Sequence, residues 1–250
     1  MTLEIATEIE QNFIAFEAQW PRDFSAAVNG LAVCRSLFLT SFVRISSFQA
    51  WRTGVLEAAM SEEASAFFFE AQNDLLISHC LARSGSFRQA LKALRSSIEN
   101  VLFALYYKDH PVELVKWNLG QHKLGFSELM TYFEGHPLIA GRQINLTGLD
   151  LLKSEYATLS KAVHGSAKGF RMTERLGDIR LWIDDKASVG KWSARERDVI
   201  AGLNLLLLSV FQEHLQGAKA LGLRQVLGLS IKKATRLAIK KDVGITLVGP

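Results

Sequence analysis

The chain has 250 residues, of which 48% are apolar and 22% charged, and its formal net charge is +4. This composition excludes an intrinsically disordered chain, and the length allows a sizeable core in one large domain or two small ones. Cys34 and Cys80 stand singly in apolar contexts, which argues against a disulfide framework or a zinc cluster and predicts reduced, buried thiols.

The N-terminal sequence MTLEIATEIEQNF is acidic and amphipathic, which is not typical of a signal peptide. The longest apolar run, 205–211, is shorter than the about 20 residues that a helix needs to cross a bilayer. We therefore expect a soluble, cytoplasmic protein with no membrane partner.

Apolar residues recur at helical spacing through the first 107 residues. Gly30 and Gly54 are weak points in this pattern, and Pro21, Pro111 and Pro137 fall where a helix could begin. Helices are expected at 3–19, 22–57, 62–84 and 87–107.

Three later patterns fit capping boxes that would open helices. They are Ser86 with Gln89 before 87–107, Thr147 with Asp150 before the helix ending near His164, and Ser193 with Glu196 before 194–217. Residues 169–184 alternate around a turn-like Leu-Gly-Asp and allow one small β-hairpin. The expected fold class is thus an all-α, multi-helix bundle. Residues 1–215 would form a single helical domain, and 216–250 a basic, helical C-terminal appendix.

One stripe of polar residues runs along the helix expected at 87–107. Arg88, Lys92, Arg95 and Glu99 step by four, three and four, and Arg95 can pair with Glu99 at i and i+4. For Arg88 and Lys92 a solvated face is the favoured interpretation. For Arg95 and Glu99 a site role stays open, because LRSSIEN lies between apolar turns.

A second stripe precedes the helix end at His164. Tyr156, Ser160 and His164 recur every four residues, with Lys161 one turn before His164 on a neighbouring line. A histidine near a helix C-terminus is usually structural, since its charged form is favoured by the helix dipole there. General acid–base chemistry is the alternative.

The segments SGSFRQALKALRSSIENVLFALYY and YATLSKAVHGS resemble HEPN-like proteins, a superfamily common in bacterial toxin–antitoxin, abortive-infection and antiphage systems. The resemblance covers 86–107 and 147–215. It implies a four- to five-helix bundle that is frequently dimeric, and active members that are metal-independent endoribonucleases without a cofactor. In those members an Arg is followed, after four to six residues, by a His.

Carried over to this chain, His164 matches the motif histidine, and Arg95 and Glu99 resemble the polar positions that often face it. The motif arginine is missing, because residues 157–159 are Ala, Thr and Leu. The resemblance thus implies two alternatives. In an endoribonuclease, His164 would exchange the proton, Arg95 would stabilise the phosphate, Glu99 would orient Arg95, and Tyr156, Ser160 and Lys161 would support them. In a non-catalytic subunit, the chain would bind a partner protein or nucleic acid in a defence complex, and a homodimer is implied in either case.

The C-terminal segment 230–244 is a candidate basic amphipathic helix. Residues 216–250 carry seven Lys or Arg against one Asp, a net charge of +6, which leaves 29 − 7 = 22 basic and 25 − 1 = 24 acidic residues before them. No aromatic residue lies in 216–250, so base stacking there is excluded. A solvated helix that closes the bundle is the alternative to phosphate binding. The candidate phosphate-binding residues are Lys232, Lys233, Arg236, Lys240 and Lys241.

Overall fold

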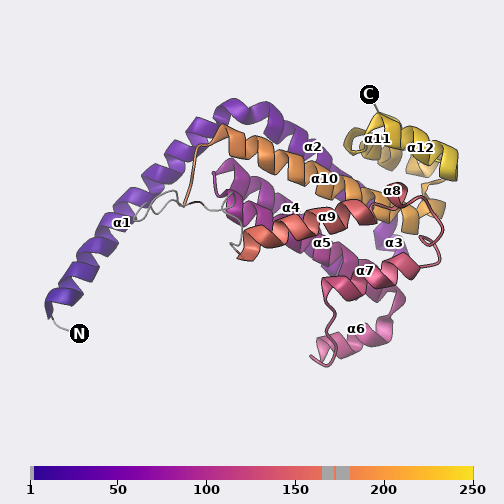
Figure 1. Cartoon of the computed structure of the whole chain (residues 1–250), viewed down its shortest axis with the longest axis horizontal. Helices are drawn as coiled ribbons and strands as arrows, with labels where there is room; N and C mark the ends of the chain where they lie inside the picture. Colours follow the sequence, from indigo (N-terminus) through magenta and orange to yellow (C-terminus); the bar gives the residue numbers. More distant parts are fainter. Residues whose placement is uncertain (1–2, 165–171, 173–180, 250) are drawn as a thin grey trace.

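The structure is a computed structural model that describes residues 3–164, 172 and 181–249. These residues form helices and connecting loops with no strand, which confirms the prediction of an all-α, multi-helix bundle (Figure 1). The principal helices are α1 (Leu3–Gly30), α2 (Arg35–Trp51), α4 (Glu62–Arg83), α5 (Phe87–Asp109), α6 (Pro111–Asn118), α7 (Phe126–Gly135), α9 (Leu149–His164), α10 (Lys186–Val210), α11 (Leu221–Ser230) and α12 (Lys233–Val243). Two shorter ones are α3 (Glu57–Ala59) and α8 (Ile144–Thr147).

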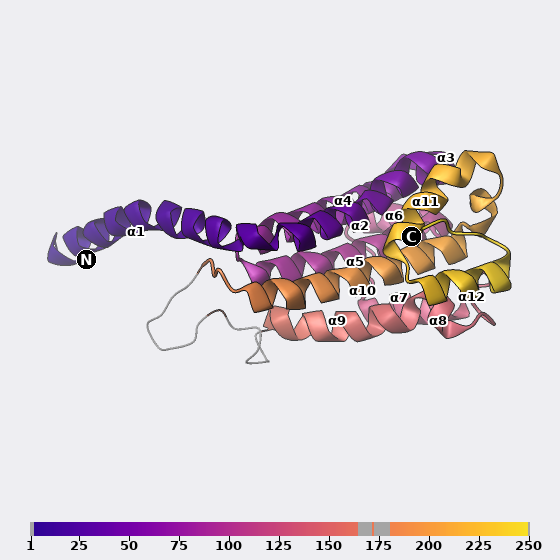
Figure 2. The same ribbon diagram turned by 90° about the horizontal axis from the view of Figure 1, so that it is seen from above.

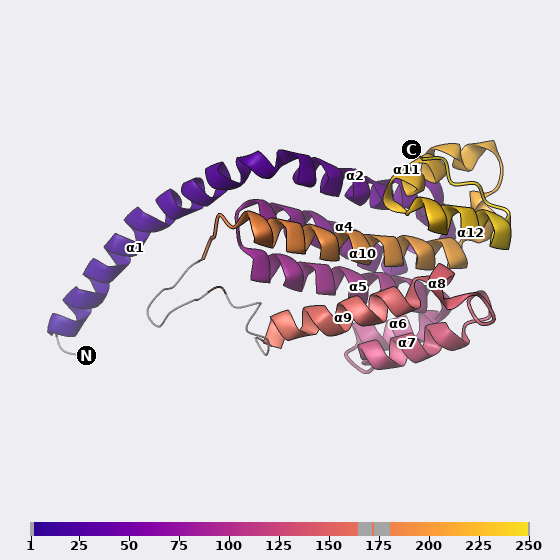
Figure 3. The same cartoon turned by 45° about the horizontal axis from the view of Figure 1, so that its top comes forward.

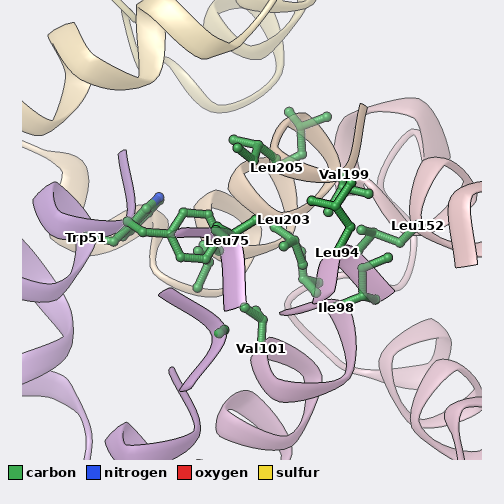
Figure 4. Close-up of a cluster of buried hydrophobic side chains, with 14 of the residues drawn as sticks. Trp51, Leu75, Leu94, Ile98, Val101, Leu152, Val199, Leu203 and Leu205 are labelled. Carbon is green, nitrogen blue, oxygen red and sulfur yellow. The ribbon is translucent and has the colours of Figure 1, made fainter. Parts of the chain in front are cut away.

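The centre of the bundle is built by five of these helices. The hairpin of α4 and α5 packs along its whole length, α9 lies against α5, and α10 bridges α9 and α2 (Figure 2). Their facing side chains form one continuous apolar core. Figure 4 shows part of it, with Trp51, Leu75, Leu94, Ile98 and Leu203 fully buried. This core fixes how the polar stripes of α5 and α9 face each other.

Helices α1, α2 and α3 follow one another in a single long rod. The rod tightens to a 3-10 turn at Leu31–Cys34 and widens to a π turn at Arg52–Leu56, which confirms Gly30 and Gly54 as weak points. Pro21 lies inside α1 and does not begin a helix. It is tolerated because this turn is exposed, so the carbonyl that loses its amide partner can bind water.

The part of α1 before Ala27, which we call the projecting half, is largely exposed and extends beyond the bundle (Figures 1 and 3). Its large apolar side chains are exposed, namely Ile5, Ile9, Phe13, Ile14, Phe16, Trp20 and Phe24. Among the described residues, the continuous helical stretch Glu4–Ala59 has the length and apolar composition that a membrane crossing requires. Most of that stretch is not covered by the rest of the chain, and the prediction of no membrane partner stays a prediction.

The three predicted capping boxes are wrong. The Ser86 side chain caps nothing, and the Thr147 hydroxyl donates to the Ile144 carbonyl and accepts the amide of Leu149, at 3.4 Å, but not that of Asp150. Helix α10 begins earlier than predicted, at Lys186, because Asp185 accepts the amides of Ala187 and Ser188. The hairpin considered for 169–184 lies mostly outside the described residues, and the described part, 181–184, is not a strand.

The C-terminal region is helical, as predicted, but it does not stand apart from the bundle. Helix α11 packs on α2, and α12 contacts α8. Six of its apolar side chains join the main core, which are Leu223, Leu227, Ile231, Ile239, Ile245 and Leu247. Residues 216–249 therefore complete the same folded unit as the helices before them.

Candidate functional site

The predicted polar residues of α5 and α9 meet in one cluster. Helix α5 presents Arg95 and Glu99 toward Tyr156 of α9, because the two helices run antiparallel in contact. The Arg95 guanidinium donates to both Glu99 Oε1, at 2.9 Å, and the Tyr156 hydroxyl. The Tyr156 hydroxyl in turn donates to Glu99 Oε1 at 2.7 Å.

The Tyr156 ring holds this cluster in place from the side. Arg95 Cζ lies 4.6 Å from the ring centroid, and the Phe126 ring stacks on Tyr156 with its centroid 3.5 Å away. Burial, followed by the Glu99 carboxylate, raises the pKa of Tyr156, so the phenol stays protonated and keeps donating. Arg95 thus has its charge matched by Glu99 and its face covered by an aromatic ring.

His164 does not join this cluster. Eight residues separate Tyr156 from His164 on the same face of α9, which is about 12 Å along the helix axis. His164 is exposed at the last described turn of α9, Lys161 is also exposed, and Ser160 is half-buried. The structure therefore brings Arg95, Glu99 and Tyr156 together and leaves His164, Lys161 and Ser160 outside hydrogen-bond reach of them.

Arg88, rather than Arg95, lies at the end of α9 that carries His164. Arg88 Nε donates to the Ala162 carbonyl at 3.0 Å, and Nη2 donates to the Val163 carbonyl at 3.3 Å. The side chain is half-buried, so it is not the solvated residue that the sequence favoured. A basic side chain that binds the last carbonyls of a helix stabilises that helix end. Arg88 and Arg95 are seven residues apart, which is about two turns of α5. The sequence therefore already indicated that both side chains could face the same neighbouring helix.

A second polar cluster, centred on Glu196, was missed by the sequence. Arg44 Nε donates to Glu196 Oε2 at 2.7 Å, and the Ser41 hydroxyl donates to Oε1 at 3.0 Å. Ser41 also bonds His79 Nδ1 at 2.9 Å, and Arg44 reaches Ser193. Glu196 is fully buried, and this burial raises its pKa to about 7 against the opposing effect of Arg44. No substrate can reach this carboxylate, so the cluster is structural.

The sequence did contain a signal for this buried cluster. Ser193 and Glu196 lie on the same face of α10 as Val189, Val199 and Leu203, all of which are buried. An acidic residue inside an apolar helical stripe needs a buried cation. The capping-box interpretation concealed this, because it placed both residues at a helix start.

The predicted phosphate-binding residues form a partly exposed surface at the C-terminal end. Lys232, Lys233, Lys240 and Lys241 are exposed, whereas Arg236 is 9% exposed and packs against the segment at Gly249. We call the four lysines the α12 lysine surface. A polyanion can reach these four lysines, whereas Arg236 is buried.

In the described part of the chain, no group of three His, Cys, Asp or Glu side chains is arranged to hold a metal ion. Cys34 is buried and Cys80 is exposed, so the prediction of two buried thiols is wrong for Cys80.

Comparison with known proteins does not identify a family. No protein-family model, curated protein or solved structure matches this chain. The HEPN-like resemblance therefore stays a hypothesis, based on the α5 and α9 sequences.

Proposed function

We propose that this protein is a non-catalytic, HEPN-like subunit of a bacterial defence system that binds RNA in the cytoplasm through the α12 lysine surface. The observation that carries the proposal is the exposure of four lysines on and just before one short helix, in a region with a net charge of +6. Apolar residues on the other side of α12 anchor it to the core, so the charges are presented from a fixed helix.

The chemistry of this surface favours the backbone of the nucleic acid over its bases. Lysine ammonium groups bind phosphates as point charges, and residues 216–250 offer no aromatic ring for base stacking. Binding by four phosphate contacts should therefore depend little on sequence and strongly on salt. For a single strand the slope of log K against log salt would be about −0.7 per contact, or about −2.8 for four contacts.

The arrangement of the α5 and α9 residues favours binding over cleavage. A metal-independent nuclease needs a proton-transfer group and a charge-stabilising group around one phosphate. His164 is about 12 Å along α9 from Tyr156, which binds Arg95. Arg95 is already engaged by Glu99 and Tyr156, so its guanidinium serves the packing of α5 on α9.

The test of RNA binding is a fluorescence anisotropy titration with a labelled single-stranded RNA at several salt concentrations. The variant replaces Lys232, Lys233, Lys240 and Lys241 with Gln, and we expect it to lose at least about tenfold in affinity and most of the salt slope. The control replaces four exposed lysines elsewhere with Gln, namely Lys116, Lys123, Lys186 and Lys191. Equal losses in both quadruple variants would show that only net charge matters and would contradict a defined surface.

The competing endoribonuclease hypothesis is tested in the same samples. We expect no cleavage of the RNA in EDTA by the wild-type chain, and identical gels for His164→Ala and Arg95→Gln. Cleavage in EDTA that His164→Ala abolishes, with an unchanged melting temperature, would replace our proposal with the catalytic one.

A further inference from the structure

A concave site lies where the projecting half of α1 meets residues 181–185, the segment that leads into α10. It has a volume of about 860 Å³, and none of its described lining residues belongs to the α5–α9 cluster or to α12. Its lining residues include Phe16, Trp20 and Asp23 from α1 and Trp182 and Asp184 from the segment. The volume is in the range of sites that hold small molecules.

Two glycines hold the segment against the helices. The Ile183 amide donates to the Gly85 carbonyl at 3.2 Å, and a Cβ at Gly85 would lie 2.3 Å from the Ile183 oxygen. A Cβ at Gly30 would lie 2.8 Å from the Asp184 Cβ. A side chain at either position would force the segment to move, and Gly85 also has a positive φ of 82° that disfavours other residues. They place Trp182 5.9 Å from Trp20, between ring centroids, so the aromatic wall is fixed from two elements.

The cavity carries negative charge and no described positive charge. Asp23 and Asp184 contribute a carboxylate from each of its two sides, and none of its lining residues among those described is basic. Gln19 donates to one oxygen of Asp23 at 2.6 Å, which orients that carboxylate. A ligand in this cavity would meet indole faces and two carboxylates together.

We propose that this cavity binds a small alkylated ammonium compound, with its cationic group against Trp20 and Trp182 and its charge balanced by Asp23 and Asp184. Indole faces attract cations through the ring quadrupole, and alkylated ammonium groups are recognised in this way because their hydration is weak. A bare metal ion would need more oxygen ligands than the two carboxylates of Asp23 and Asp184. An anion would be repelled by both aspartates, and a neutral apolar compound would leave their charges unmatched.

The test uses tetramethylammonium chloride and choline chloride as probes, titrated into the full chain by isothermal calorimetry. We expect saturable binding of both with a Kd below about 10 mM. The neutral isostere of choline, 3,3-dimethylbutan-1-ol, should bind at least about tenfold more weakly, and ammonium chloride at equal ionic strength should show no saturable heat. Equal binding of choline and the alcohol would overturn the cationic assignment, and so would the absence of saturable binding by either probe.

Matched variants locate the site. Trp182→Leu and the double change Asp23→Asn with Asp184→Asn should each weaken choline binding by at least about tenfold. Trp117→Leu is the control, because Trp117 lies on α6 and does not line the cavity. The isosteric Asn changes are at exposed positions and leave the fold intact, which circular dichroism verifies. Unchanged choline affinity in the double Asn variant and in Trp182→Leu would place the binding elsewhere and refute the proposal.

Discussion

The same apolar stripe has two different environments along the rod formed by α1 and α2. In the projecting half it runs through Ile9, Phe13, Phe16 and Trp20, which step by four, three and four and are between 41% and 56% exposed. In the half that lies on the bundle it continues through residues 27, 31, 34 and 38 with the same steps, and none of these is more than 9% exposed. Helical periodicity therefore identifies which side of a helix is apolar, but not whether anything covers it.

The largest expected difference is between two substitutions in the same apolar stripe, one in each half of the rod. Phe38→Ala should lower the free energy of unfolding by about 3–5 kcal/mol, because Phe38 is 3% exposed and its removal leaves a cavity. Phe13→Ala should change it by no more than about 0.5 kcal/mol at protein concentrations where the chain is monomeric. Urea denaturation followed by circular dichroism measures both. Similar losses would mean that the projecting half is covered within the monomer.

The next effect concerns the half of the rod that lies on the bundle. It tests the buried ion pair between Arg44 of α2 and Glu196 of α10. The raised pKa of Glu196, about 7 against an ordinary 4.5, means that the folded state holds a proton that the unfolded state releases between these pH values. The contribution of Glu196 to stability is thus fully present below pH 4.5 and is lost as the pH rises through about 7, by about 1–3 kcal/mol. Glu196→Gln should lack this loss. His79, whose pKa is lowered by burial, is present in both proteins, so the difference between their melting curves isolates Glu196.

The smallest effect is at the junction of the two halves. Gly30→Ala should gain up to about 1 kcal/mol of helix propensity but lose a similar amount, because its Cβ would lie 2.8 Å from the Asp184 Cβ. The net change in unfolding free energy should be within about 1 kcal/mol. The segment at Trp182 should shift instead, which tryptophan fluorescence emission reports, and Gly190→Ala is the control because nothing lies within 4 Å of a Cβ there.

The fold class could be predicted from the sequence because helical periodicity is local. The ends of α10 could not, since Asp185 begins the helix while Ser193 and Glu196, which look like a cap, face Arg44. Whether Ser193 and Glu196 cap a helix or contact Arg44 depends on packing between residues about 150 positions apart in the sequence. A local pattern carries no information on such distant contacts.

The candidate site was predicted in part. The sequence placed Arg95 with Glu99 on one stripe and Tyr156 with His164 on another, and the structure joins Arg95, Glu99 and Tyr156. The sequence could not show which turn of α5 faces which turn of α9, because that register is set by the apolar contacts of the whole bundle. For this reason Arg88 lies at the end of α9, where the sequence had suggested Arg95.

The burial of residues near the C-terminal end has a consequence for how the chain folds during synthesis. Ile245 and Leu247 belong to the same core as Leu31 and Phe48, so the earliest and latest parts of the sequence are needed together. Domains usually acquire structure as they emerge from the ribosome, with the N-terminal part first. Here the rod of α1 and α2 is made first and must wait for α10, α11 and residue 247 before its apolar face is closed. The nascent chain therefore exposes that face until α10, α11 and residue 247 have been made, and this is the period when chaperones would bind it.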